Sequence, residues 1–530
     1  MAGEISRVGV VGLGTMGAGI AEVLARSGLE VVGVEVGETA LARGRANLEK
    51  STGRAVARGK LSDAAAAEIL SRVELRAELA AMADVDLVVE AVPERLEIKR
   101  GLFTELDRIC PPATILATNT SSLPVIEIAM ATGRPDRVLG MHWFNPAPIM
   151  GLVEVVSTVR TDPAVVGEVA RLASRAGKTA VRVGDRAGFI ANALLFGYLN
   201  AAASMHESGH AARQDIDVAM TVGVGLPMGP LALLDLIGLD TAYEILETMY
   251  RASGDRLHAP APILRQLVTA GLLGRKTGRG FYAYDGSDEP VSTAPIEARP
   301  VARIGVVGGG PPATDIAASL AGGGYDVARL EPSADPGPLV DRDLAVIVGD
   351  GGSVQLSELD RALRPGAVLA LMVPAGTPVV RLAATTSRPA DVVGLRWRDT
   401  ALVEVASTVA TAPDAAAAVR EVCEKAGRTV VCCRDRAGLV VDALLFPHLN
   451  AAVRMLDSGY ATESDIDAAM RLGCAYPAGP FQLLDRIGVD VALATQAALY
   501  RETPEPGLAP SPLLEQLALT GRHGPGSAGR

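Results

Sequence analysis

The chain has 530 residues, and domains of roughly 100–200 residues predict three to five domains rather than one hydrophobic core. Hydrophobic residues make up 49% and charged residues 21%, which is ordinary globular usage and excludes wholesale disorder. The formal net charge of −11 argues against a general nucleic-acid binder, because such a protein needs a concentrated basic face.

Neither a metal site nor a membrane anchor is indicated by the sequence. The five cysteines show neither paired nor metal-ligand spacing, which favours a reducing compartment. The nearly uncharged run Gly366–Val380 contains two prolines and is shorter than the ~18–20 residues that a spanning helix needs. We therefore expect a cytoplasmic protein with no membrane partner and no nucleic-acid partner.

The first 184 residues alternate predicted strands with predicted helices. That alternation predicts a parallel, doubly wound sheet of the Rossmann type. Between them, Glu38–Ser71 is rich in alanine and arginine, with helical periodicity and a break near Gly59. Strands are expected at Arg7–Gly12, Val31–Glu35, Asp86–Ala91, Thr114–Thr118, Val138–Met141 and Val153–Val156, and helices at Gly17–Ser27 and Leu96–Ile109.

After Asp185 the strand signals stop, and the pattern becomes helical throughout. This change predicts an all-helical second domain. Its helices are expected at Phe189–Ser208, Arg213–Val222, Leu231–Ile237 and Asp240–Arg251.

The chain also contains a second copy of itself. Asp185–Tyr250 matches Asp435–Tyr500 at a constant offset of 250, and Arg7–Gly14 matches Arg303–Gly310 at an offset of 296. The second copy has therefore lost 296 − 250 = 46 residues. We predict an α/β Rossmann domain plus an all-helical domain, the pair repeated in tandem: 1–184 and 185–285, a linker at 286–302, then 303–434 and 435–530.

A dinucleotide fingerprint opens the chain. Gly12, Gly14 and Gly17 form G-x-G-x-x-G around Met16, between a predicted strand and a predicted helix, where a pyrophosphate would meet free helix N–H groups. Glu35 ends the next strand, 21 residues after Gly14, where an acid accepts hydrogen bonds from the adenosine ribose and repels a 2′-phosphate. The pattern predicts NAD as cofactor; the alternative is a glycine turn that binds nothing.

The second copy departs from this fingerprint. It reads Gly308-Gly309-Gly310-Pro311-Pro312, with Glu331 retained. Proline has no N–H to donate, and two prolines stand where backbone donors should face phosphate. We predict weak or absent NAD binding there.

Polar residues that suit alcohol oxidation follow the later strands. His142 follows a predicted strand, and Glu154 lies on the next one, where its carboxylate can orient the imidazole as a general base. Asn119, Ser121 and Ser122 follow the preceding strand and can hydrogen-bond a hydroxyl or a cofactor. The alternatives are a structural histidine and an ordinary surface acid.

These residues resemble the 3-hydroxyacyl-CoA dehydrogenase family over essentially the whole chain. The resemblance implies that His142 is the general base, that Glu154 orients it, and that Ser121 and Asn192 hold the hydroxyl and thioester region of the substrate. The matching strings are VGLGTMGAGIA, ATNTSSLPV, GMHWFNPAPIMGLVEVV, GDRAGFIANALL, DIDVAMTVGVGLPMGPLALLDLIGLD and LGRKTGRGFY.

The resemblance implies further contacts. Glu94, Lys99 and Asn119 match positions that contact the nicotinamide half of NAD. The 38–71 arm resembles a helical hairpin that packs over CoA, where Arg54 or Lys60 would meet a phosphate; solvation at the surface is the alternative for both.

The implied activity is the reversible, NAD-dependent oxidation of (3S)-3-hydroxyacyl-CoA to 3-oxoacyl-CoA. The implied substrates are short, such as 3-hydroxybutyryl-CoA, or dicarboxylic, such as 3-hydroxyadipyl-CoA, and the tandem arrangement resembles the bacterial branch of phenylacetate breakdown. Two alternatives stay open: a non-catalytic NAD- or acyl-CoA-binding protein, and a dehydrogenase of a related 3-hydroxy acid. A lysine-dependent dehydrogenase of the 3-hydroxyisobutyrate type is disfavoured, because no lysine occurs between Lys178 and Lys276.

The second copy has lost the chemical residues and kept the helical half. Arg396 stands for His142 and Asp442 for Asn192, while Glu404 keeps its acid. Since family members with one copy dimerise through the helical domain, we expect an intramolecular pseudo-dimer of helical domains, with further homo-oligomerisation left open.

Overall fold

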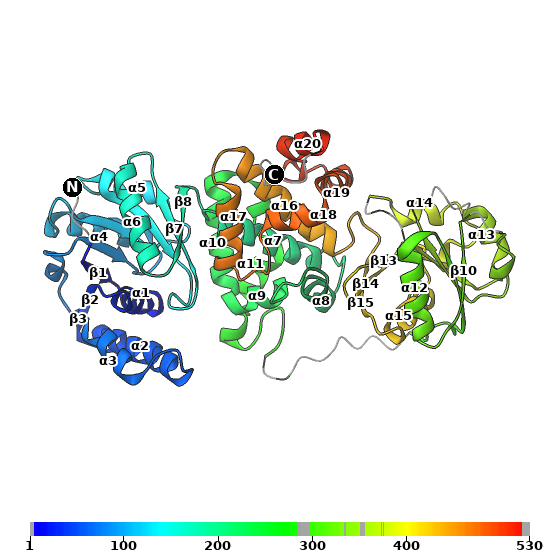
Figure 1. The fold of residues 1–530 in the computed structure, drawn as a ribbon, viewed down its shortest axis with the longest axis horizontal. Helices are drawn as coiled ribbons and strands as arrows, with labels where there is room; N and C mark the ends of the chain where they lie inside the picture. Colours follow the sequence, from blue (N-terminus) through cyan, green and yellow to red (C-terminus); the bar gives the residue numbers. More distant parts are fainter. Residues whose placement is uncertain are drawn as a thin grey trace. The chain divides into compact units, whose positions relative to one another are not determined.

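The protein is described here by a computed structural model of the chain (Figure 1). It describes residues 5–284, 286, 296–332, 335–349, 356–372, 374 and 376–521. Most of the predicted linker, residues 287–295, lies outside the described part. The chain forms two compact units, one of residues 1–195, 248–254 and 455–483, the other of residues 196–247, 255–454 and 484–530. Each unit therefore combines segments of both sequence copies.

The first sheet has eight strands in the order β3-β2-β1-β4-β5-β6-β7-β8. The expectation of an all-parallel sheet is wrong at one step, because β7 pairs with β6 in the antiparallel direction and β8 runs parallel to β7. Only 144–151 connect β6 to β7, too few residues for a helical crossover. The strands are β1 (Arg7–Val11), β2 (Glu30–Val34), β3 (Val73–Arg76), β4 (Leu87–Glu90), β5 (Ile115–Thr118), β6 (Val138–Trp143), β7 (Leu152–Ser157) and β8 (Thr179–Gly184).

Helices cover both faces of this sheet, as continuous apolar strands such as β4 require. Residues of α1 (Thr15–Arg26) and α6 (Pro163–Arg175) join the hydrophobic cluster on one face. Residues of α4 (Leu96–Ile109) and α5 (Val125–Ala129) join the cluster on the other. The sheet order places the switch point between β1 and β4, where this class of fold binds dinucleotides.

The arm after β2 is a pair of helices, α2 (Gly37–Ala57) and α3 (Asp63–Ser71), as the periodicity predicts (Figure 1). The turn between them contains Gly59 at φ +66, a conformation that costs glycine little. The hydroxyl of Ser62 caps α3 by accepting the N–H of Ala65 at 3.1 Å. Strand β3 follows the arm and was not predicted, since four partly exposed residues carry no apolar run.

The second sheet has seven strands in the order β10-β9-β11-β12-β13-β14-β15. Among the described residues, it repeats the first sheet without the arm and without a counterpart of β3. The strands are β9 (Arg303–Val307), β10 (Asp326–Leu330), β11 (Leu344–Val348), β12 (Val368–Met372), β13 (Val392–Trp397), β14 (Leu402–Ser407) and β15 (Thr429–Arg434), and its α-helices are α12 (Gly310–Gly322), α13 (Leu356–Ala362), α14 (Val379–Ala383) and α15 (Pro413–Lys425).

Each copy ends in a set of five helices. In both sets a buried aspartate fixes the start of a helix: Asp217 accepts N–H groups of Leu231 and Ala232, and Asp467 accepts those of Phe481 and Gln482. The helices are α7 (Ala191–Glu207), α8 (Arg213–Val224), α9 (Pro230–Ile237), α10 (Leu239–Ser253) and α11 (Pro262–Thr269), then α16 (Val441–Asp457), α17 (Glu463–Gly473), α18 (Pro480–Ile487), α19 (Val489–Glu502) and α20 (Pro512–Leu519).

The two copies exchange helices. Within one unit, α17 of the second copy packs on β7 and β8 of the first sheet. Within the other unit, α8 of the first copy packs on β14 and β15 of the second sheet. In the described part of the chain, no helix combines the length and apolar character that crossing a bilayer requires.

Candidate active site

The glycine loop between β1 and α1 has the shape that a bound pyrophosphate needs. Gly12 has φ +90, and a Cβ there would lie 2.7 Å from the carbonyl oxygen of Ala91 on the neighbouring chain segment. A Cβ on Gly17 would lie 1.7 Å from the carbonyl oxygen of Gly12, so only glycine lets α1 pack against the loop. Gly14 precedes the helix and has nothing within 4 Å of its Cβ position, and no described side chain caps this helix end. The residues present therefore fit a dinucleotide phosphate at the N-terminus of α1, where Met16 lies in the first turn.

Glu35 lies directly after β2, beside this loop. Its Oε1 accepts the N–H of Leu13 at 2.7 Å, which holds the carboxylate at the edge of the glycine turn. A carboxylate at this position suits ribose hydroxyls and repels a 2′-phosphate. The sequence expectation and the geometry thus agree on the place of the acid.

His142 and Glu154 form a buried pair on adjacent strands. They lie directly opposite each other in the antiparallel register of β6 and β7, and Nδ1 of His142 is 2.7 Å from Oε2 of Glu154. The exposed fraction is 5% for His142 and 0% for Glu154. The strand β6 runs on to Trp143, so His142 lies within the strand and not after it as expected.

The other oxygen of Glu154 is anchored by the start of α7. Its Oε1 accepts the backbone N–H groups of Ile190 and Ala191, each at 3.0 Å. Because a carboxylate only accepts, its Oε2 accepts a hydrogen bond from the Nδ1–H of His142, which leaves Nε2 as the basic nitrogen of the ring. Asn192 is the next residue of α7 and is partly buried.

Two aromatic rings flank the imidazole. The ring of Phe144 lies 4.4 Å from that of His142, and the ring of Phe189 lies 5.6 Å from it. Phe189 has φ +48, a conformation that is uncommon for a bulky residue. It sits between Gly188 and Ile190, in the turn that delivers the N–H groups to Glu154. Sequence reasoning missed both rings, since nothing in their spacing distinguishes them from core residues.

The residues after β5 form a hydrogen-bonded loop. Asn119 accepts the N–H of Trp143 through Oδ1 at 2.9 Å, which ties the loop to the strand of His142. Glu94 accepts the N–H of Ser121 at 2.8 Å and the hydroxyl of Thr120 at 2.6 Å. Partial burial alone would raise the pKa of Glu94, but the charge of Lys99 and these hydrogen bonds hold that pKa below its usual value. Ser122, the third predicted residue of this loop, is buried.

A buried ion pair lies behind this loop. Lys99 on α4 is 1% exposed and donates to Oε1 of Glu90 at 2.7 Å, with Oε2 of Glu94 at 3.1 Å. Glu90 is fully buried and also accepts the hydroxyl of Thr118 and the N–H of Val92. Sequence reasoning missed Glu90; an acid inside the apolar strand LVVE was the available signal. The structure places the predicted Lys99 against these carboxylates.

The two residues predicted for CoA phosphates lie on the arm. Arg54 is on α2 and Lys60 is in the turn before α3, and both are exposed.

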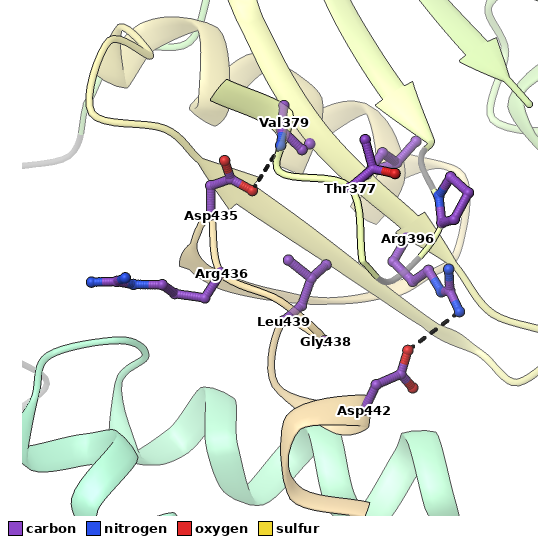
Figure 2. A pocket seen from close by; sticks show the side chains of 11 residues that line it. Thr377, Val379, Arg396, Asp435, Arg436, Gly438, Leu439 and Asp442 are labelled. Atoms are coloured by element: carbon purple, nitrogen blue, oxygen red, sulfur yellow. Dashed lines mark hydrogen bonds and ion pairs between the residues drawn. The ribbon is translucent and has the colours of Figure 1, made fainter. Parts of the chain in front are cut away.

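The corresponding place in the second copy holds an ion-pair network (Figure 2). Arg396 pairs with Asp442 at 3.3 Å beside a pocket that Thr377, Val379 and Leu439 also line. Arg398 donates to Glu404 and to Asp442, at 2.6 Å and 2.8 Å. Arg396 and Arg398 thus form ion pairs with the carboxylates of Asp442 and Glu404. An arginine, Arg396, stands where the first copy has the imidazole of His142.

The second glycine loop also differs as predicted. Pro311 and Pro312 stand in the first turn of α12, where they present no N–H to a phosphate. Glu331 is paired with Arg329 at 2.9 Å rather than with the loop backbone.

The chain is similar to known proteins along nearly its whole length. Residues 7–186 match the model of the 3-hydroxyacyl-CoA dehydrogenase NAD binding domain, and residues 188–284 and 438–529 both match the C-terminal domain of that family. The chain is 33% identical to 3-hydroxyadipyl-CoA dehydrogenase of Escherichia coli K12 over 97% of this chain and 98% of that protein. It is 46% identical to 3-hydroxybutyryl-CoA dehydrogenase of Mycobacterium tuberculosis, which covers 54% of this chain and 100% of that protein.

A solved structure shares the tandem architecture. The crystal structure of 3-hydroxybutyryl-CoA dehydrogenase from Escherichia coli K12 superposes with a TM-score of 0.79 at 33% identity, covering 98% of this chain and 99% of that one. Full-length matches to a tandem enzyme, together with family models on three of its parts, settle the family. The chain belongs to the 3-hydroxyacyl-CoA dehydrogenase family, a family of NAD-dependent oxidoreductases.

Proposed function

We propose that the first copy oxidises (3S)-3-hydroxyacyl-CoA to 3-oxoacyl-CoA reversibly, with His142 as general base and Glu154 as its orienting partner. The observation that carries the proposal is the 2.7 Å contact between Nδ1 of His142 and Oε2 of Glu154, two buried groups on adjacent strands. An imidazole fixed in this way can accept a proton at Nε2 in the oxidation and return it in the reduction.

The residues divide the chemistry between them. Bound NAD supplies the acceptor for the hydride that leaves carbon 3 of the substrate. His142 takes the hydroxyl proton at the same time, and Glu154 stabilises the resulting imidazolium. Ser121 and Asn192 are proposed to hold the hydroxyl and thioester oxygens, and Asn119, Glu94 and Lys99 to shape the nicotinamide side. Gly12, Gly14, Met16, Gly17 and Glu35 would hold the rest of the cofactor.

For the acyl group we propose a short chain, either the four-carbon 3-hydroxybutyryl or the dicarboxylic 3-hydroxyadipyl group. Both names occur among the relatives, the second on one that matches nearly the whole tandem chain. The test measures kcat/KM for NADH oxidation with 3-oxoacyl-CoAs of about four to ten carbons and with 3-oxoadipyl-CoA. A preference for the four-carbon or the adipyl substrate supports the assignment, a preference for longer chains contradicts it, and no turnover with any of them would favour a binding protein.

We also propose that the two helical halves form a pseudo-dimer within one chain. The ring of Tyr198 on α7 lies 5.9 Å from that of His448 on α16, and Arg454 is 3.5 Å from Asp255. Helix exchange between the copies supports the same reading. Deleting 303–530 should leave a poorly soluble or newly dimerising fragment; a stable, active monomer would contradict the proposal.

We also propose the four domains and linker bounded as given above, and a cytoplasmic location. Both rest on the sequence, and the location is supported by the cysteines, all five of which are free thiols.

A further inference from the structure

The strand that carries Glu154 is covered by a helix of the degenerate copy. Helix α17 packs on β7 and β8 within one compact unit. Tyr460, just before this helix, donates its hydroxyl to the carbonyl oxygen of Gly184 at 2.8 Å, and the guanidinium of Arg186 lies 4.3 Å from its ring. Burial raises the pKa of the Tyr460 phenol, and the negative charge of Glu154 raises it further. The second copy therefore reaches close to the catalytic carboxylate of the first.

The last residue of α17 is Gly473, which has no side chain and lies against Leu152 and Phe144 of the first copy. A Cβ on Gly473 would lie 2.7 Å from Cδ2 of Leu152, 3.1 Å from Cε1 of Phe144 and 3.2 Å from Cζ of Phe144. Phe144 is 9% exposed and its ring packs 4.4 Å from His142. A Cβ at Gly473 is so close to this ring that the ring must give by a few tenths of an ångström, and the imidazole of His142 is one of the ring's neighbours.

We propose that Gly473, a residue of the degenerate copy, is a positioning residue for catalysis in the first copy: it leaves the space in which the Phe144 ring holds His142 against Glu154. The proposal rests on the assignment of His142 as the base. It gives the second copy a part in the reaction without a ligand of its own.

The chain carries a matched control in its other half. Gly223 is the counterpart of Gly473 at the offset of 250 between the copies, and it lies in α8. A Cβ there would be 2.7 Å from Cδ2 of Leu402 and 3.0 Å from Cγ2 of Val441. Leu402 is the counterpart of Leu152, so a Cβ added at either glycine would meet the corresponding leucine Cδ2 at the same distance. The three atoms nearest to a Cβ at Gly223 belong to Leu402 and Val441 rather than to an aromatic ring, and Arg398, which occupies the place of Phe144 in sequence (398 − 144 = 396 − 142 = 254), donates to Glu404.

The test compares Gly473→Ala with Gly223→Ala in the full chain. Both glycines are helical with negative φ, so alanine brings the same gain in helix propensity and the same contact with leucine. We expect kcat to fall by up to about tenfold for Gly473→Ala, because the ring must shift by a few tenths of an ångström and a full 1 Å misplacement costs ~10²-fold, while the Kd of NADH stays unchanged. Gly223→Ala should keep the kcat of the wild type. Equal kcat values for the two variants, or loss of NADH binding in Gly473→Ala, would overturn the proposal.

A second variant guards against a mere folding defect. Adding Phe144→Leu to Gly473→Ala removes the ring, so the two substitutions should be strongly non-additive, and the double variant should be no slower than Phe144→Leu alone. Additive losses would overturn the proposal. A crystal structure of Gly473→Ala gives a readout independent of turnover: the Phe144 ring should be shifted toward His142, and an unmoved ring rejects the inference. Failure of the proposed reaction would instead appear as absent turnover in the wild type.

Discussion

Nε of Arg398 donates to Oε2 of Glu404 at 2.7 Å, the hydrogen bond that Nδ1 of His142 makes to Oε2 of Glu154 in the first copy. The backbone of the second copy is otherwise the same here, because Val440 and Val441 donate to Oε1 of Glu404 as Ile190 and Ala191 do to Glu154. A permanent cation has thus replaced a titratable base on the same carboxylate. Guanidinium groups stay protonated in proteins, so this pair cannot accept a proton.

Removing the imidazole should abolish most turnover. For His142→Ala we expect kcat/KM to fall by ~10²–10⁴, the usual contribution of a general base. The matched variant Arg396→Ala changes the corresponding residue of the second copy and should leave kcat/KM near the wild-type value. Steady-state assays with acetoacetyl-CoA and NADH check both, and unchanged turnover in His142→Ala would remove the base assignment.

The two buried glutamates should separate activity from stability. Glu154→Gln should lower kcat by at least tenfold, since the amide no longer stabilises an imidazolium. Glu404→Gln should leave kcat nearly unchanged but lower the free energy of unfolding by about 2 kcal/mol, because a hydrogen bond between charged groups is lost. Denaturant titration and initial rates on the same preparations measure the two effects. A catalytic defect in Glu404→Gln comparable to that of Glu154→Gln would contradict this division.

Lys99 should act on stability through Glu90. The Lys99→Met variant leaves a fully buried carboxylate with only a hydroxyl and an N–H as partners, and we expect a loss of about 3 kcal/mol in unfolding free energy. Removing both charges, with Glu90→Gln and Lys99→Met together, should recover part of that loss. Chemical denaturation monitored by circular dichroism tests this. A double variant with a lower free energy of unfolding than Lys99→Met would contradict the prediction.

The cofactor should bind once per chain. Calorimetric titration of the full chain with NADH is expected to give one site, because Pro311 and Pro312 remove donors from the second loop. Glu35→Ala should weaken NAD binding by about tenfold, since the ribose loses a charged acceptor. The preference for NAD over NADP, measured as the ratio of their Kd values, should fall as well. Two equal NADH sites, or unaltered selectivity in Glu35→Ala, would disagree with the loop geometry.

Asp86 and its counterpart Asp343 should stabilise the fold near neutral pH and lose this contribution in acid. Burial alone would raise the pKa of Asp86 and of Asp343, but N–H donors lower both: Ser6 and Arg7 for the first, Ala302 and Arg303 for the second. A folded-state pKa below the unfolded value of ~3.9 stabilises the protein above that pH, and the stabilisation is lost as pH falls through the folded pKa.

The Asn variants of these two residues should therefore be less stable than the wild type near neutrality. The difference should shrink as the pH is lowered below ~3.9. Urea unfolding midpoints across an acid series give the comparison, with constant differences at every pH as the contrary result.

Much of the architecture could be predicted from the local sequence. The β1–loop–α1 unit follows from an apolar run and three glycines, and the break of the arm follows from Gly59. The duplication, the place of Glu35 and the loss of chemistry in the second copy could also be predicted, because they need only residue identity and register. His142 and Glu154 could be paired from sequence since they lie on consecutive strands.

What only the tertiary structure decided is which distant residues meet. The antiparallel direction of β7 and the placing of the Phe144 and Phe189 rings beside His142 depend on packing between segments that carry no mutual sequence signal. The approach of Gly473 to Phe144 is the extreme case, because it joins positions 329 residues apart (473 − 144) from different copies. Periodicity reports the face that a residue buries; it does not report what the chain later places against that face.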